Sequence, residues 1–448
     1  MNNKISSYLF ILSLLFAVGG CAQNSAYRTN YTACTFAMEG DCAVNAIQHT
    51  DAGKNDEYYL GFVEYNDQGQ LRHREQMQAV LDKYYAIASK EDVLLIVFVH
   101  GWHHSASPGD TNIQQFRRLL ARVSEIESAS KANLAKGSKT ADPARKVLGV
   151  YIGWRGDSIS VPVLNGITFW DRKGTAHNVG LQGVTETLLR LEEIVNVKAG
   201  IETRVPKPLN SRLVVIGHSF GGAVVFTSVQ QILADRFIDS HKTKTYSSDA
   251  QGFGDLVVLL NPAFEALRFA TLYDISQNGC RRYFPTQLPK LAILTSESDY
   301  ATKYAFSIGR FFSTMFESHT TLTRHQCTAK GPTELLVDEG DADRNTVGHF
   351  EPYLTHLLLP AKTTRPRGSD DSYQQLRNNW SKQQDSGTLN FGGTDLVHLG
   401  KTRPLNPYLN IKVDSELIPN HNDIWDDRVV SFVRDLIVIS TLPVSATK

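Results

Sequence analysis

Residues 214–225, "VVIGHSFGGAVV", place a serine between two glycines where a strand-like sequence changes into a helix-like one. The run before the serine is rich in β-branched residues, which is typical of a buried strand. Ser219 lies between Gly217 and Gly221. Glycine removes side chains that would crowd a tight turn whose central residue has a strained backbone. The pattern therefore predicts a strand–turn–helix with the Ser219 hydroxyl above the end of the strand, the arrangement called a nucleophile elbow.

Similar apolar runs recur on both sides of this stretch and alternate with segments of helical spacing. We expect strands at residues 93–101, 146–154, 212–219, 255–262, 290–299 and 408–414. Helices are expected at about 75–89, 112–128, 177–197, 222–237 and 423–438, and two short strands around a turn at 57–72. Alternating apolar strands and amphipathic helices predict an α/β fold, with a mostly parallel sheet covered by helices on both faces.

The remaining segments define the expected domain organisation. Residues 21–50 are polar and are expected to form a loop-like tether, and residues 51–448 a single α/β domain with an insertion at about 300–405. The polar stretch 362–387 is expected to be an exposed loop. The apolar segments 160–170 and 304–316 could line a pocket, form a lid or pack in the core, and we favour the core for the second.

The first twenty residues have the features of an export signal. Lys4 precedes an apolar run, residues 9–18, that is too short to span a bilayer. The following "VGGC" resembles the bacterial lipobox, which implies that Cys21 becomes the lipidated first residue of the mature chain. Ala22 rather than aspartate after the cysteine indicates the outer membrane of the cell envelope. A plain secretory signal is the alternative.

Four cysteines remain once Cys21 is assigned to an anchor: Cys34, Cys42, Cys280 and Cys327. An even number in an exported chain favours two disulfides. Three pairings are possible, and the pairing of sequence neighbours joins Cys34 to Cys42 and Cys280 to Cys327. Their spacing does not match a zinc site, so no metal is expected.

The overall charge argues against one class of partner. The chain has 448 residues, 42% of them hydrophobic, with 46 basic and 46 acidic side chains. This balance gives no indication of binding to nucleic acid.

Polar groups follow several of the expected strands, at the sheet edge where sites form in such folds. His100 and Gly101 end the strand-like run 93–101. A turn of this kind supplies a backbone amide to a developing oxyanion, and the residue after the nucleophile supplies another. We therefore expect the amides of Trp102 and Phe220 to form the oxyanion site. A polar loop or metal patch made by the histidines of this turn is the alternative.

An acid and a base follow the serine along the chain. Asp299, at the end of the strand-like run 290–299, is the preferred acid, with Glu297 and Glu265 as alternatives. His421 lies in a short loop between the last expected strand and the terminal helix, from which an imidazole could reach the serine as a general base. His349 is the second choice because a long insertion could fold back over the site.

Together these residues resemble the serine-hydrolase branch of the α/β-hydrolase superfamily. They also follow its order of nucleophile, acid and histidine. The resemblance covers residues 93–299 and 407–436, and the long stretch between them departs from the family pattern. The matching residues are His100, Gly101, Gly217, His218, Ser219, Phe220, Gly221, Asp299 and His421.

The resemblance implies an esterase or lipase that uses a Ser-His-Asp triad and no cofactor on a small-molecule or lipid ester. Thioesterases and acyltransferases share this fold, so they remain alternatives. An inactive, lipid-anchored binding protein on the same fold is the rival from another class. The oligomeric state is left open.

Overall fold

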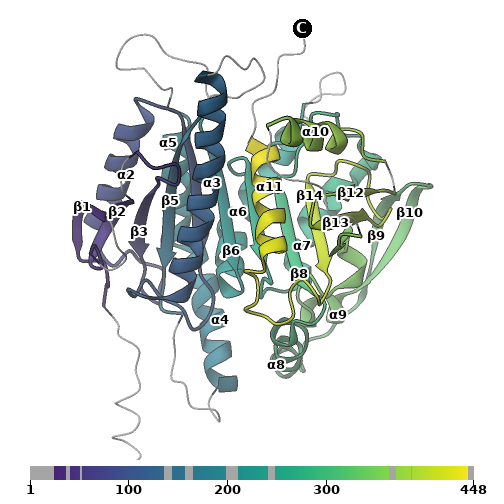
Figure 1. Ribbon diagram of the computed structural model, residues 1–448. Helices are drawn as coiled ribbons and strands as arrows, with labels where there is room; N and C mark the ends of the chain where they lie inside the picture. The colour runs from purple at the N-terminus through teal and green to yellow at the C-terminus, as the bar shows by residue number, and fades with distance from the viewer. Residues whose placement is uncertain are drawn as a thin grey trace, which may run out of the picture.

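A twelve-stranded sheet organises the computed structural model (Figure 1), with strand order β1-β2-β3-β5-β4-β6-β7-β8-β14-β11-β13-β12. The structure describes residues 25–36, 41–50, 53–135, 144–156, 165–197, 210–240, 248–362, 370–384 and 386–441. From β3 to β11 all neighbouring strands are parallel. The predicted α/β class with a mostly parallel sheet is confirmed.

The centre of the sheet consists of the strands expected from the apolar runs. Almost every residue in them is buried, because helices cover both faces. They are β4 (Val93–Val99), β5 (Lys146–Gly153), β6 (Arg212–His218), β7 (Leu256–Leu260), β8 (Leu291–Ser296) and β14 (Tyr408–Val413).

Successive residues of each central strand enter separate cores on the two faces of the sheet. In β4, Leu95 and Val97 belong to one core, and Ile96 and Phe98 to the other. The first core is closed by α2 (Arg74–Ala88), α5 (Gly183–Val195), α6 (Phe220–Asp239) and α7 (Ala266–Gln277). The second is closed by α3 (Thr111–Ala135), α10 (Asp370–Trp380) and α11 (Asp427–Thr441).

The single helix expected at 177–197 is in fact two helices. α4 (Asn165–Leu181) ends before α5 begins at Gly183. The Gly183 amide donates to the Gly69 carbonyl at 2.9 Å, and a side chain at Gly183 would meet that carbonyl at 2.6 Å. The helix is interrupted at this point because Gly69, in the turn after β3, packs against Gly183.

At the edge of the sheet formed by β1, two expectations from the sequence are wrong. β1 (Asn30–Phe36) and β2 (Asn45–Thr50) pair with each other, and β2 pairs with β3 (Tyr59–Glu64), so a loop-like tether is wrong for these residues. Most of β1 is exposed, so no apolar pattern revealed it. The expected pair of strands at 57–72 is reduced to β3 and one bridge between Tyr65 and Leu71.

At the other edge, part of the insertion continues the sheet beyond β14. The added strands are β11 (His356–Pro360), β13 (Thr394–His398) and β12 (Thr388–Asn390). β9 (Thr321–Thr328) and β10 (Gly331–Asp338) form a separate hairpin. The exposed loop expected at 362–387 is wrong for α10, which buries Leu376 and Trp380.

Both expected disulfides are present. Cys34 bonds to Cys42, and Cys280 bonds to Cys327. The expected signal peptide and Cys21 lie outside the described residues. Among the described residues, no helix combines the length and apolar character needed to cross a bilayer.

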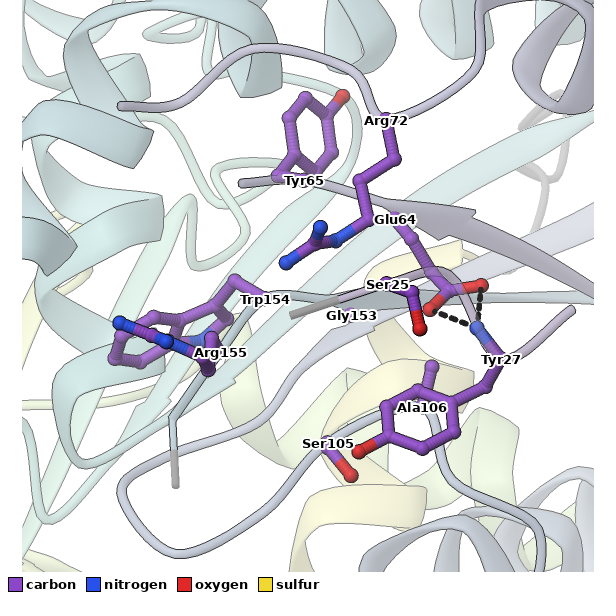
Figure 2. A pocket seen from close by; sticks show the side chains of 10 residues that line it. All are labelled: Ser25, Tyr27, Glu64, Tyr65, Arg72, Ser105, Ala106, Gly153, Trp154 and Arg155. Carbon is purple, nitrogen blue, oxygen red and sulfur yellow. Dashed lines mark hydrogen bonds between the residues drawn. The ribbon is translucent and has the colours of Figure 1, made fainter. Parts of the chain in front are cut away.

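The first described residues lie at the carboxyl edge of the sheet. The Tyr27 amide donates to the carboxylate of Glu64, the last residue of β3, and Arg28 Nε donates to the Ala106 carbonyl in the loop after β4. Figure 2 shows Ser25 and Tyr27 around a small pocket, together with residues that follow the ends of β3, β4 and β5. The chain therefore enters the fold at this edge.

Candidate active site

Ser219 occupies a strained turn between β6 and α6. Its backbone has φ 54° and ψ −122°, a region that residues other than glycine rarely adopt. The amide of Ser219 donates to the Leu260 carbonyl of β7 at 2.9 Å, and its carbonyl accepts from the Ala263 amide at 3.1 Å. The neighbouring strand thus holds the turn, and the Ser219 side chain leaves it at the carboxyl edge.

Glycines allow the end of β4 to press against this turn. A side chain at Gly221 would lie 2.1 Å from the Val99 carbonyl, and one at Gly101 would lie 2.7 Å from Cβ of Ser219. At Gly217 a side chain would meet the Gly221 carbonyl at 2.7 Å. The obstructing atoms are backbone atoms or, at Gly101, a Cβ whose position the backbone fixes, so all three positions require glycine.

The serine lies where the strand order changes direction. The chain runs from β4 to β5 on one side of β4, and then to β6 on the other side. Crevices that bind ligands form at such switch points in parallel sheets. The loop after β4 and the turn after β6 bound this point.

A hydrogen-bonded chain joins the three side chains expected to form a triad. His421 Nε2 lies 2.6 Å from Ser219 Oγ, and His421 Nδ1 lies 2.8 Å from Asp299 Oδ2. Asp299 is fully buried. Burial alone would raise its pKa, but the His421 imidazole and a hydrogen bond from Thr302 lower the pKa below its ordinary value. The ionised carboxylate requires the proton on Nδ1, which leaves Nε2 free to accept from the serine hydroxyl.

Two side chains whose supporting role was not predicted from the sequence hold the histidine loop. The His421 carbonyl accepts from His218 Nε2 at 3.1 Å and from Asn261 Nδ2 at 2.9 Å. Burial and the nearby His421 lower the pKa of His218 to about 3, so its imidazole is neutral and donates through Nε2. Asn261 Oδ1 in turn accepts from the Ser296 amide at 2.9 Å. Polar residues at the ends of buried strands were the signal that could have revealed both.

The other carboxylates do not reach His421. Glu265 is buried and paired with Lys173, with Arg268 at 2.9 Å and with Arg310 at 3.3 Å. Glu297 accepts from the Ser415 amide at 3.3 Å. Of the three candidates, only Asp299 is hydrogen-bonded to the imidazole.

The ion pairs of Glu265 predict a pH-dependent contribution to stability. Burial would raise its pKa, but Lys173 and Arg268 outweigh burial and lower the pKa to about 2. A carboxyl group whose pKa is lowered in the folded state stabilises the fold at pH values above its pKa in the unfolded chain, which is about 4.5. This stabilisation is lost as the pH falls toward 2. We expect Glu265→Gln to lower the free energy of unfolding by about 3 kcal/mol at neutral pH. In urea titrations the difference from the wild type should shrink below pH 4.5; a difference independent of pH would contradict this assignment.

His349, the second choice for the base, is connected to the triad acid through Thr302. Its Nε2 is 3.0 Å from Thr302 Oγ1, and that hydroxyl donates to Asp299 Oδ2 at 2.5 Å. Burial lowers the pKa of His349 to about 4, so its ring is neutral. Thr302 therefore positions Asp299 through the same carboxylate oxygen that bonds to His421, and His349 supports Thr302.

This arrangement predicts a small effect for the second histidine. His349→Ala removes one hydrogen bond to Thr302, so kcat for the ester hydrolysis expected from the sequence should fall by no more than about tenfold. His421→Ala, measured beside it, should abolish turnover because the imidazole that contacts the serine is gone. The reverse ranking would show that His349 is the base.

His100 and Gly101 form the wall of the site on the β4 side. His100 is buried, its Nδ1 donates to the Gly101 carbonyl at 2.8 Å, and its Nε2 accepts from the Trp154 amide at 3.1 Å. Burial lowers the pKa of His100 to about 4, which suits this neutral state. Trp102 follows Gly101, which packs against Cβ of Ser219, and Phe220 follows the serine directly. Their role as oxyanion donors remains a prediction.

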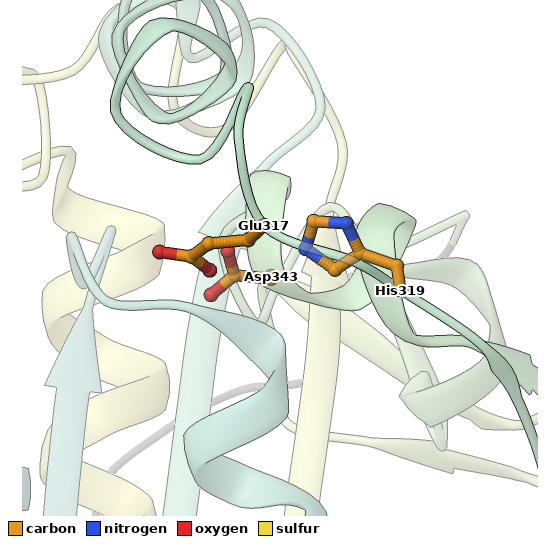
Figure 3. A group of neighbouring side chains, drawn as sticks. All are labelled: Glu317, His319 and Asp343. Atoms are coloured by element: carbon orange, nitrogen blue, oxygen red, sulfur yellow. The ribbon is translucent and has the colours of Figure 1, made fainter.

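One cluster among the described residues has ligand types that could hold a metal ion. Atoms of Glu317, His319 and Asp343 lie within 4.8 Å of one another (Figure 3). The Asp343 carboxylate is already bound by Arg310 Nη2, at 2.6 Å and 2.7 Å from its two oxygens. Since this guanidinium supplies the positive charge, the cluster gives no argument for a metal.

In the histidine patch that was the alternative for the turn after β4, His104 pairs with Asp110 at 3.1 Å.

Comparison of the chain with protein-family models, with curated proteins and with solved structures gives no match.

Proposed function

We propose that this protein is a serine ester hydrolase with an α/β-hydrolase fold. The observation that carries the proposal is the Ser219–His421–Asp299 hydrogen-bonded chain at a strained strand–turn–helix. A buried hydroxyl, an imidazole and an ionised carboxylate in this order favour nucleophilic attack on an acyl carbon.

In the first half of the reaction, Ser219 Oγ forms a bond to the ester carbonyl carbon while its proton moves to His421 Nε2. The carbonyl oxygen becomes an oxyanion, for which the Trp102 and Phe220 amides are the proposed donors. Collapse of this intermediate breaks the ester C–O bond, and the leaving alkoxide takes the proton from Nε2. The products are the free alcohol and an acyl group on Ser219.

Water completes the reaction through the same groups. His421 Nε2 takes a proton from water as the oxygen attacks the acyl carbon, and the second collapse expels Ser219 Oγ, which regains that proton. Asp299 keeps the Nδ1 proton in place and stabilises the imidazolium in both halves.

Nitrophenyl esters of graded acyl length test this function. The proposal requires that the folded protein hydrolyse at least the short, water-soluble members, and the length dependence then defines the acyl pocket. A folded protein without turnover on any member would favour the inactive binding protein.

We further propose that the protein is an exported lipoprotein of the bacterial cell envelope. The two disulfides support an oxidising compartment. Mass analysis of the mature chain tests the anchor: acylation at Cys21 supports it, and a mature chain that begins elsewhere argues against it.

A further inference from the structure

An apolar stripe covers the outer side of the segment that follows the triad acid. Residues 300–316 pass through the π-helical turn η3 (Ala301–Ala305) and α8 (Phe306–Ser313). Five members, from residue 300 to residue 316, recur at every fourth position, and the four of them up to residue 312 lie on one helical face. The exposed fractions run from 49% to 92%, and the members of the stripe are Tyr300, Tyr304, Ile308, Phe311, Phe312, Met315 and Phe316. Folded proteins rarely expose so many large apolar side chains together without a partner. The core packing expected for residues 304–316 is therefore wrong.

The opposite face of the same segment fixes its orientation. Thr302 hydrogen-bonds to Asp299, and Phe306 is fully buried. Arg310 pairs with Glu265 at 3.3 Å and with Asp343 at 2.6 Å. Turning the stripe inward would break these buried ion pairs and disturb the triad acid, so its exposure is a stable feature of the fold.

The composition of the stripe suits a lipid surface. The Lys303 ammonium lies 5.4 Å from the centre of the Tyr304 ring, and the Arg344 guanidinium lies 5.2 Å from that of Phe311. Aromatic rings flanked by basic groups are typical of segments at the boundary between lipid headgroups and acyl chains.

The start of the described chain lies at the same edge of the sheet. The stripe follows β8, and α8 lies beyond the carboxyl end of the sheet in Figure 1, while Ser25 lies beside the carboxyl end of β3 in Figure 2. Five strand spacings, roughly 24 Å, separate β3 from β8. Cys21 precedes Ser25 by four residues, and a connection of this length spans at most about 14 Å. A lipid on Cys21 would hold this edge toward the bilayer, with Ser219 between the anchor and the stripe.

We propose that the stripe of residues 300–316 lies on a phospholipid bilayer and turns the carboxyl edge of the sheet, with Ser219, toward the lipid. The orientation rests on the lipidation of Cys21 proposed above, and it does not depend on the chemistry at Ser219.

Fluorescence labelling at two exposed positions tests this docking. The exported, lipidated chain is reconstituted in vesicles of phosphatidylethanolamine and phosphatidylglycerol. Since its native cysteines are acylated or disulfide-bonded, Phe316→Cys gives one free thiol for an environment-sensitive nitrobenzoxadiazole dye. Phe316 is 92% exposed, so the change disturbs little. The matched control is Ile238→Cys, 58% exposed at the far end of α6, which starts beside Ser219 and runs about 30 Å away from the carboxyl edge.

Docking predicts that iodide in the water quenches the dye at position 316 several-fold less than the dye at position 238. Equal quenching would overturn the proposal. Protection at 316 that disappears when the protein is diluted in excess lipid would assign the stripe to a second copy and also overturn it. Fluorophosphonate labelling of Ser219 in the same samples reports the proposed hydrolase separately, so either proposal can fail while the other stands.

Discussion

Replacing Ser219 with alanine is expected to lower kcat for a soluble nitrophenyl ester by about 10⁶-fold, leaving only the small acceleration that binding and oxyanion contacts provide. The reason is that Ser219 Oγ, 2.6 Å from His421 Nε2, is the atom that takes up the acyl group in the proposed mechanism, so no acyl-enzyme forms without it. Initial-rate kinetics over a range of ester concentrations measure the effect.

Ser313→Ala is the control for this change. Ser313 is an exposed serine at the same end of the molecule, and its hydroxyl bonds only to the Arg310 carbonyl in the described contacts. The kcat of the Ser313→Ala variant should equal that of the wild type. A Ser219→Ala variant that retains wild-type turnover would remove the serine from the mechanism.

Replacing Asp299 with asparagine is expected to lower kcat by about 10⁴-fold with little effect on folding. The amide has nearly the shape of the carboxylate, so the Thr302 amide can still donate to the side-chain oxygen. An amide facing Nδ1 no longer fixes the proton there and cannot stabilise the imidazolium. KM should change much less than kcat, because Asp299 is buried and contacts His421 and Thr302.

Glu297→Gln is the matched control, since it makes the same chemical change two residues away. Glu297 accepts a hydrogen bond from the Ser415 amide and does not contact His421, so the kcat of the Glu297→Gln variant should stay near that of the wild type. If Glu297→Gln and Asp299→Asn reduced kcat equally, the assignment of the acid would be wrong.

The centre of the sheet could be predicted because strands that are buried on both faces have sequences of consecutive apolar residues. β4, β6 and β7 read as continuous apolar runs, and glycines are required where β4 meets the turn after β6. Ser219, Asp299 and His421 could be proposed because each follows a strand whose carboxyl end lies at the same edge.

The rest depends on contacts that periodicity does not encode. β1 is an exposed edge strand, and the mostly polar α10 is held by Leu376 and Trp380. In the segment 300–316, apolar spacing identifies a helical face but not whether protein covers that face. The supporting roles of His218 and Asn261 depend on their contacts with the His421 loop, which is distant from both in the chain.

The most direct test of the central claim is labelling with a fluorophosphonate probe followed by peptide mapping. We predict one modified residue, Ser219, in the folded wild-type protein, and loss of that label in both Ser219→Ala and His421→Ala. A folded wild-type chain that stays unlabelled, or a label that maps to another serine, would contradict the claim that these three side chains form a working catalytic unit.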